Sequence, residues 1–136
     1  MPADLVALSP RVWRQALERL RQPGGVLWMP VDEFAHGKVS TPSFGRPPAV
    51  GDNVGKIARL ALRTGAVVLP FYGERHPGLE FTTQILPPLE FKGDAADDAA
   101  VLAAVKAIDA VVTPPIVRLL DQWYMAFFYR DHAYPA

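Results

Sequence analysis

The sequence predicts an α/β fold, in which a mixed, largely parallel sheet is flanked by helices. Residues 26–31 and 66–72 are continuous apolar runs without alternation, a pattern typical of strands that are covered on both faces in a parallel sheet. An amphipathic helix is predicted between them, and the order strand, loop, helix, strand indicates a crossover unit. A chain of 136 residues is long enough for one core, so we expect a single domain over residues 1–136.

The first predicted element is a helix over about residues 9–21. Ser9 can cap it with its hydroxyl, and Pro10 suits its first turn. Gly24 and Gly25 stop it. Apolar residues recur inside it at helical spacing, at Trp13, Ala16, Leu17 and Leu20.

The predicted strand at residues 26–31 leads directly to Asp32 and Glu33. The carboxyl ends of parallel strands are where α/β folds place ligand groups, so these two acids are candidates for a site. An ordinary acidic turn after a strand is the alternative. Residues 38–42 are a second, short extended piece.

A second helix is predicted over about residues 52–64 and ends at Gly65. It leads into the second buried strand, residues 66–72. Residues 79–85 alternate between apolar and polar, which indicates a half-exposed strand that pairs antiparallel or at a sheet edge. The inner stripe of the second helix consists of Val54, Ile57, Ala58 and Ala61.

The last predicted helix occupies residues 94–113 and is expected to stop at Pro114, because proline has no N–H to continue it. Its apolar stripe consists of Val101, Val105, Ile108 and Val112. A dense aromatic segment follows and is interpreted as core, with a membrane interface as the alternative; it contains Trp123, Tyr124, Phe127, Phe128 and Tyr129.

Composition narrows the possible functions. Fourteen basic and fourteen acidic residues cancel, so no overall field favours nucleic acid, and no nucleic-acid partner is expected. The chain has no cysteine and three histidines, one of them His36 in an ordinary loop setting, so a metal site is not expected. We expect neither a signal peptide nor a membrane-spanning helix, because no basic segment followed by an apolar core and no apolar run of about 18 residues is seen, so any membrane contact is expected to be peripheral.

Residues 40–56 form a loop rich in glycine and proline ahead of the second helix. Such a loop and the helix N-terminus that follows can bind an anion. A nucleotide-binding P-loop is not indicated, since Gly51 and Gly55 are separated by three residues instead of four, and Ile57 follows Lys56 where Ser or Thr is required. The hypothesis of a nucleotide-binding domain would therefore be supported by the number of glycines alone.

Four stretches, in order along residues 12–130, resemble the C-terminal half of the lipid A biosynthesis acyltransferases, relatives of the lysophospholipid acyltransferases. "GGVLWMPVDEF" is similar to the family's glycine, buried strand and acidic turn. "VSTPSFGRPPA" is similar to its Pro-Phe-Phe-Gly block, with Ser43 in place of the first Phe. "GAVVLPFYGER" and "DQWYMAFFYRD" are similar to its strand leading to Arg and to its closing aromatic segment.

The resemblance implies an enzyme that moves a fatty acyl chain from an acyl thioester to a hydroxyl of a lipid A precursor or lysophospholipid. The implied donor is acyl carrier protein or acyl-coenzyme A, without a metal or dissociable cofactor. Phe44, Gly45, Arg46 and Arg75 are implied to bind substrate phosphate, which would make the loop at residues 40–56 a cradle for a lipid or acyl-carrier phosphate. Peripheral location at the cytoplasmic face of the inner membrane is also implied.

One family feature is missing. The family's general base is a His followed five positions later by an acid, whereas His36 is followed at that offset by Thr41 and His76 by Phe81. We therefore expect a truncated C-terminal portion of an acyltransferase domain that is inactive alone, lacks an N-terminal half and exposes apolar surface. The alternative is a non-catalytic lipid- or protein-binding α/β module.

Overall fold

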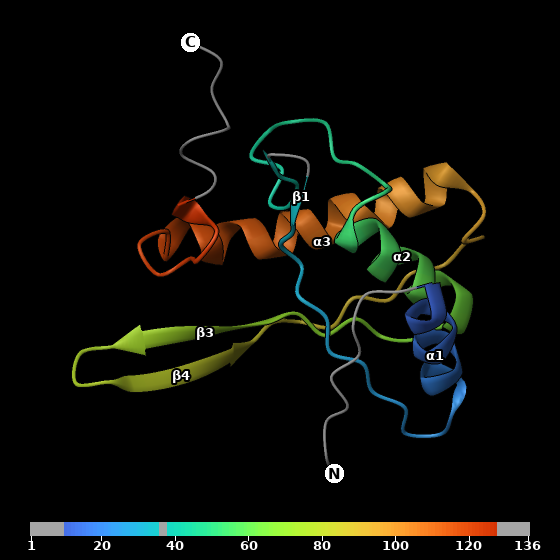
Figure 1. Ribbon diagram of the computed structural model, residues 1–136, viewed down its shortest axis with the longest axis horizontal. Coiled ribbons are helices and arrows are strands. Elements are labelled where there is room, and N and C mark those ends of the chain that lie inside the picture. The colour runs from blue at the N-terminus through green and yellow to red at the C-terminus, as the bar shows by residue number, and fades with distance from the viewer. Residues whose placement is uncertain (1–9, 36–37, 128–136) are drawn as a thin grey trace.

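Residues 10–35 and 38–127 are described by the structure, a computed structural model, as three helices and two pairs of strands (Figure 1). The long helix α3 crosses the molecule, α2 packs on α3, and α1 packs on α2; a strand hairpin reaches away from α1 and α2 on the side where α3 ends. In chain order the elements are α1 (Pro10–Arg21), β1 (Phe34–Ala35), β2 (Lys38–Val39), α2 (Asn53–Thr64), β3 (Phe71–His76), β4 (Glu80–Ile85) and α3 (Asp98–Arg118).

The core lies between α2 and α3. The predicted stripe of α3 is confirmed in full, because all four of its residues are buried against α2. The predicted stripe of α2 is confirmed at three positions, with Ile57 half-buried. The buried residues of this core are Val54, Ala58, Val101, Ala104, Val105, Ile108 and Val112.

Both ends of α2 follow the sequence signals. The Asp52 carboxylate accepts a hydrogen bond of 3.0 Å from the Gly55 N–H, which is the expected N-cap contact. At the other end Gly65 has a φ of 70° and its N–H donates to the Ala61 carbonyl at 2.8 Å. The helix predicted over residues 9–21 is confirmed from Pro10 onward as α1, while Ser9 lies outside the described residues.

The prediction that Pro114 ends the last helix is wrong, since α3 continues through Pro114 and Pro115. The φ of proline is compatible with a helix, so what opposes continuation is the loss of two N–H donors and the crowding of each proline ring against the carbonyl four residues earlier. The loss of these N–H groups leaves the carbonyls of Ala110 and Val111 without helical donors, and Ala110 is exposed to water. Within the described part of the chain, α3 has the length and apolar composition of a membrane span, criteria that a core helix also meets.

The predicted parallel sheet is not present among residues 10–35 and 38–127. Both strand pairs there are antiparallel: β1 with β2, and β3 with β4 in a register that joins Phe71 to Ile85 and His76 to Glu80. The antiparallel pairing predicted for residues 79–85 is confirmed. Gly78, with a φ of 82°, lies in the short turn that brings β4 back along β3, and such a turn can only produce antiparallel neighbours.

The predicted buried strand at residues 26–31 is wrong, and the one at residues 66–72 is confirmed only at Phe71 and Tyr72, which begin β3. Residues 26–31 have no regular secondary structure, and residues 66–70 make a single antiparallel bridge, from Val68 to Leu89. Several of their side chains are exposed, Val26 by 76% and Trp28 by 68%. A strand needs a neighbour for its N–H and C=O groups, and no strand among the described residues pairs with residues 26–31. The expected exposure of apolar surface at these runs is confirmed.

The β3–β4 hairpin is fastened to the end of α3. Arg118 donates two hydrogen bonds to the Glu74 carboxylate, at 3.0 and 2.9 Å, and a third to the Tyr72 hydroxyl at 2.9 Å. The hydrogen bond from Arg118 lowers the pKa of Glu74, and the bond to Glu74 raises the pKa of Arg118. One bidentate pair therefore links the helix to one face of the hairpin.

Candidate functional site

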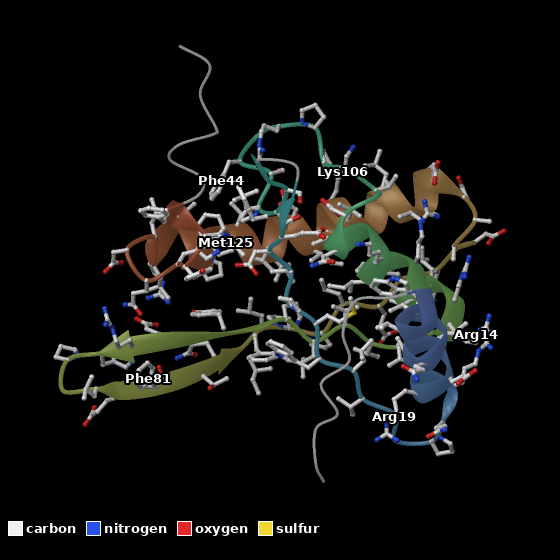
Figure 2. All side chains as sticks on the ribbon, in the orientation of Figure 1. Arg14, Arg19, Phe44, Phe81, Lys106 and Met125 are labelled. Atoms are coloured by element: carbon white, nitrogen blue, oxygen red, sulfur yellow. The ribbon has the colours of Figure 1, made fainter. Side chains whose placement is uncertain are left out.

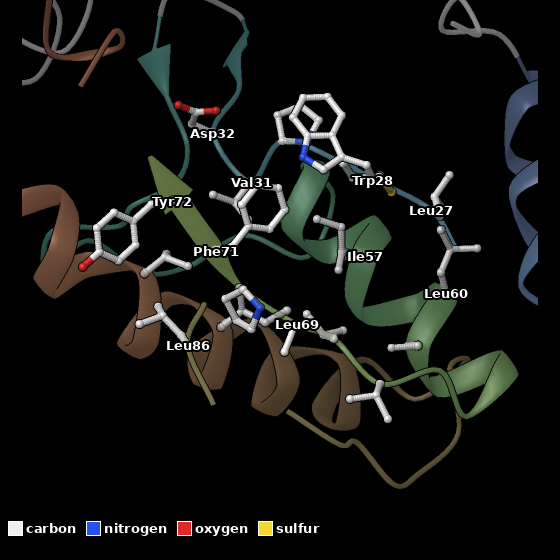
Figure 3. Close-up of a pocket in the computed structure, with 18 of the residues that line it drawn as sticks. Leu27, Trp28, Val31, Asp32, Ile57, Leu60, Leu69, Phe71, Tyr72 and Leu86 are labelled. Atoms are coloured by element: carbon white, nitrogen blue, oxygen red, sulfur yellow. The ribbon is translucent and has the colours of Figure 1, made fainter. Parts of the chain in front are cut away.

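The described residues enclose an apolar pocket of about 420 Å³, which we call the acyl-sized pocket (Figure 3). Its walls come from the two apolar runs that the sequence predicts as strands, from α2 and from α3. The residues that line it include Leu27, Trp28, Val31, Ile57, Leu60, Leu69, Phe71, Leu86, Ile108, Val112, Ile116 and Trp123. Nearly every side chain in this lining is aliphatic or aromatic, so the pocket suits a hydrocarbon ligand.

One end of the pocket is polar. Asp32 lines it there, and its carboxylate accepts a hydrogen bond of 3.0 Å from the indole Nε1–H of Trp123. The Phe44 ring meets the Trp123 ring edge to face, with centroids 5.8 Å apart. Asp32 and Phe44, both predicted as site residues, are thus brought together by a tryptophan 91 positions from Asp32.

The loop that contains Phe44, Gly45 and Arg46 is held rigidly. Ser43 donates its N–H and its hydroxyl to the Asp109 carboxylate on α3, at 2.8 and 2.6 Å. Phe44 has a φ of 47° and Gly45 a φ of 85°, left-handed conformations that turn the chain sharply. The loop also contains a cis peptide bond before Pro42. Its backbone is therefore fixed against α3.

Arg46 is directed at its own loop. Its guanidinium donates to the carbonyls of Val39, Ser43 and Pro42 at 2.7, 2.9 and 3.1 Å. These three bonds tie the Arg46 side chain to the turn and stabilise the conformation of that turn.

The N-terminus of α2, predicted as part of an anion cradle, is occupied by the chain's own carboxylates. Glu33 accepts from the Asn53 N–H at 2.9 Å, and Asp52 accepts from the Gly55 N–H. Lys56 lies 3.8 Å from the other Glu33 oxygen. Glu33 therefore stabilises the helix start, and two negative charges already lie where a phosphate would bind.

Arg75 has a different environment. Its backbone N–H donates to Gln122 Oε1 at 2.8 Å, and its carbonyl accepts from Gln122 Nε2 at 3.1 Å. Its guanidinium makes no hydrogen bond or ion pair with any residue in the described part of the chain, and the residue is exposed. Gln122 binds the backbone of Arg75, and Trp123 contacts the Phe44 ring. Two predicted site residues are therefore held by two neighbouring residues of the segment that follows α3.

Sequence reasoning missed the residues that assemble this region. Asp109 had no local signal, because it is an isolated acid in the apolar middle of α3. Gln122 and Trp123 belong to the aromatic segment, which was interpreted mainly as core; that interpretation is wrong for Tyr124 and Phe127, which are 75% and 74% exposed. His36, Phe128 and Tyr129 lie outside the described residues.

No group of three or more His, Asp or Glu side chains in residues 10–35 and 38–127 could hold a metal ion. His76 is placed on the hairpin, where its Nε2 lies 2.8 Å from the Thr82 hydroxyl. The hydrogen-bond partner of the His76 imidazole is therefore a hydroxyl and not a carboxylate.

Comparison with known proteins gives one match. The family model described as bacterial lipid A biosynthesis acyltransferase matches residues 4–126, which is most of the chain and covers α1 through the Gln122–Trp123 segment. No curated protein and no solved structure matches the chain.

Proposed function

The chain belongs to the bacterial lipid A biosynthesis acyltransferase family, and we propose that it is the portion of such an enzyme that holds the acyl chain and faces the lipid acceptor. The observation that carries this proposal is the acyl-sized pocket. Its volume falls within the range of small-molecule sites, and it combines apolar walls with one polar end at Asp32 and Trp123.

In the proposed reaction the acceptor hydroxyl loses its proton to a general base, and its oxygen bonds to the thioester carbonyl carbon. The C–S bond then breaks, and the thiolate leaves and takes up a proton. The donor is acyl carrier protein or acyl-coenzyme A, and the acceptor is a lipid A precursor or lysophospholipid. The hydrocarbon chain would lie in the pocket with its thioester at the polar end.

Residues around the polar end are assigned separate roles in this proposal. Arg75 binds a phosphate of the acceptor, because its guanidinium is exposed and can form a bidentate pair with phosphate oxygens. Phe44 supports the polar end through its ring contact with Trp123, and Gly45 turns the chain beside that contact. Arg46 acts as a positioning residue, because its donors hold the carbonyls of the same turn.

We further propose that the general base comes from an N-terminal half of the same enzyme and that this chain alone is inactive. No histidine of this sequence has an acid five positions later. The exposed apolar runs at residues 26–31 and 66–70 support an origin as sheet strands that lost their neighbours. We also propose that the protein associates peripherally with the cytoplasmic face of the inner membrane, where a lipid acceptor would be reached. The family match does not favour the alternative of a non-catalytic binding module.

The test uses dodecanoic acid as the probe of the pocket. Leu69 lines the pocket and Phe81 does not, while both are exposed apolar residues, at 51% and 69%. A charge at Leu69→Asp would sit in an apolar wall, so calorimetry should show affinity weakened tenfold or more. Phe81→Asp is the matched control and should bind as the wild type does. Equal affinities of the two variants, or no binding by the wild type, would contradict the proposal.

A further inference from the structure

A second groove lies between α1 and α2, with a volume of about 190 Å³; we call it the α1–α2 groove. Three cations of α2 line it, Lys56, Arg59 and Arg63. Their spacing of three and four places them along one stripe of the helix. The other lining residues are Trp13 and Leu17 of α1 and Leu60 of α2.

The positive charge of this region is only partly neutralised. Lys56 is 3.8 Å from Glu33 and 5.5 Å from the centre of the Trp13 ring. Arg59 donates to Asp98 and to the Ala95 carbonyl.

Arg63 forms no hydrogen bond or ion pair within the described part of the chain, and it is exposed. On α1 three further arginines, Arg14, Arg19 and Arg21, are exposed beside a single acid, Glu18. Figure 2 shows Arg14 and Arg19 projecting from α1, far from Lys106 on α3. Because the whole chain has no net charge, α1 and α2 together carry a local excess of positive charge.

The shape of the groove favours a helix as its ligand. Lys56 and Arg63 are seven residues apart, which is about 10.5 Å along a helix at 1.5 Å per residue. A partner helix with acids at matching spacing would meet all three cations in two turns, and its apolar face could contact Leu17, Leu60 and the Trp13 ring. A flat lipid surface would reach the exposed arginines and leave the concave floor uncovered.

We propose that the α1–α2 groove binds an acidic amphipathic helix on the carrier protein that delivers the acyl thioester. The proposal rests on the proposed function, because acyl transfer requires a thioester donor. It adds where the donor's protein part docks: at the groove between α1 and α2, with Arg63 of the lining and Arg14, the neighbour of Trp13 on α1, as the main contacts.

The experiment measures binding of purified bacterial acyl carrier protein by calorimetry at low salt. Arg63→Glu and Arg14→Glu should each weaken binding about tenfold, and the wild-type affinity should fall as salt is added. Lys106→Glu is the matched charge reversal, at an exposed lysine of α3 outside the groove, and this variant should bind the carrier protein as the wild type does. An equal effect of Lys106→Glu, no wild-type binding, or binding of phosphatidylglycerol vesicles in its place would overturn the proposal.

Dodecanoic acid separates this proposal from the one on which it rests. The groove variants should bind the fatty acid as the wild type does, because none of the substituted residues lines the acyl-sized pocket. Fatty-acid binding without any effect of Arg63→Glu on carrier-protein affinity would reject the groove alone. Carrier-protein binding that depends on Arg63, without fatty-acid binding, would instead reject the proposed function.

Discussion

Ser43 and Asp109, 66 positions apart in sequence, form a two-point contact in which the serine N–H and hydroxyl both donate to one carboxylate. The contact joins the turn before Phe44 to the middle of α3. It places that turn next to the polar end of the acyl-sized pocket, where Phe44 meets Trp123.

Removing this carboxylate should release the turn. Asp109→Ala leaves the buried Ser43 hydroxyl and N–H without their acceptor, so we expect a loss of about 1–3 kcal/mol in the free energy of unfolding. Ser43→Ala removes the hydroxyl and keeps the N–H contact, so its effect should be smaller. Urea denaturation measures both. An Asp109→Ala variant as stable as the wild type would show that the contact is not required.

Gly55 should tolerate no side chain. A Cβ there would collide with the backbone carbonyl of Val50, which is not at the end of a flexible side chain and cannot move aside easily. Gly55→Ala is therefore expected to cost about 1–3 kcal/mol of stability, although alanine favours helices. Gly51→Ala is the matched control, because nothing lies within 4 Å of its Cβ position. Thermal unfolding followed by circular dichroism would contradict this account if both variants melted alike.

The hairpin should loosen from α3 in acid. The pKa of Glu74 is lowered in the folded chain by its hydrogen bond from Arg118. The pair therefore stabilises docking of the hairpin on α3 at pH values above 4.5, the ordinary pKa of a glutamate. That contribution is lost as the pH falls through the depressed pKa, below 4.5. NMR shifts of the Tyr72 and Arg118 amides should therefore change between about pH 5 and pH 2.

Glu74→Gln controls for other titrations, since its amide cannot ionise. In that variant the NMR shifts of the Tyr72 and Arg118 backbone amides should show no transition between about pH 5 and pH 2. A transition of unchanged size in Glu74→Gln would assign the acid response to another carboxylate.

The two arginines of the candidate site should respond differently to removal. Arg46→Ala deletes three donations to loop carbonyls and should lower stability by about 1–3 kcal/mol. Arg75→Ala should leave stability unchanged and weaken binding of a short-chain phosphatidic acid by about 1.5–3 kcal/mol, roughly ten- to a hundredfold. Calorimetry below the micelle concentration measures the affinity, with ATP as the control ligand. Unchanged lipid affinity in Arg75→Ala, or tighter binding of ATP, would remove Arg75 from the site.

The sequence by itself determined the extent of α1 and α2 and the inner faces of α2 and α3. α1 and α2 were predicted nearly to the residue, because capping groups, glycine stops and apolar spacing all act within one or two helical turns. The same holds for the buried stripe of α3. The family could be predicted as well, since its four stretches are contiguous in sequence.

Only the tertiary structure decided the strands and the contacts of the site. An apolar run indicates that a segment can be buried, but whether it is buried depends on a neighbour that is distant in sequence. The exposure of residues 26–31 could therefore not be predicted from those residues alone. The roles of Arg46 and Glu33 depend on carbonyls and N–H groups reached through space. Asp109 and Trp123 act across 66 and 91 positions, and no local pattern encodes contacts at that separation, because they form only after the helices have packed.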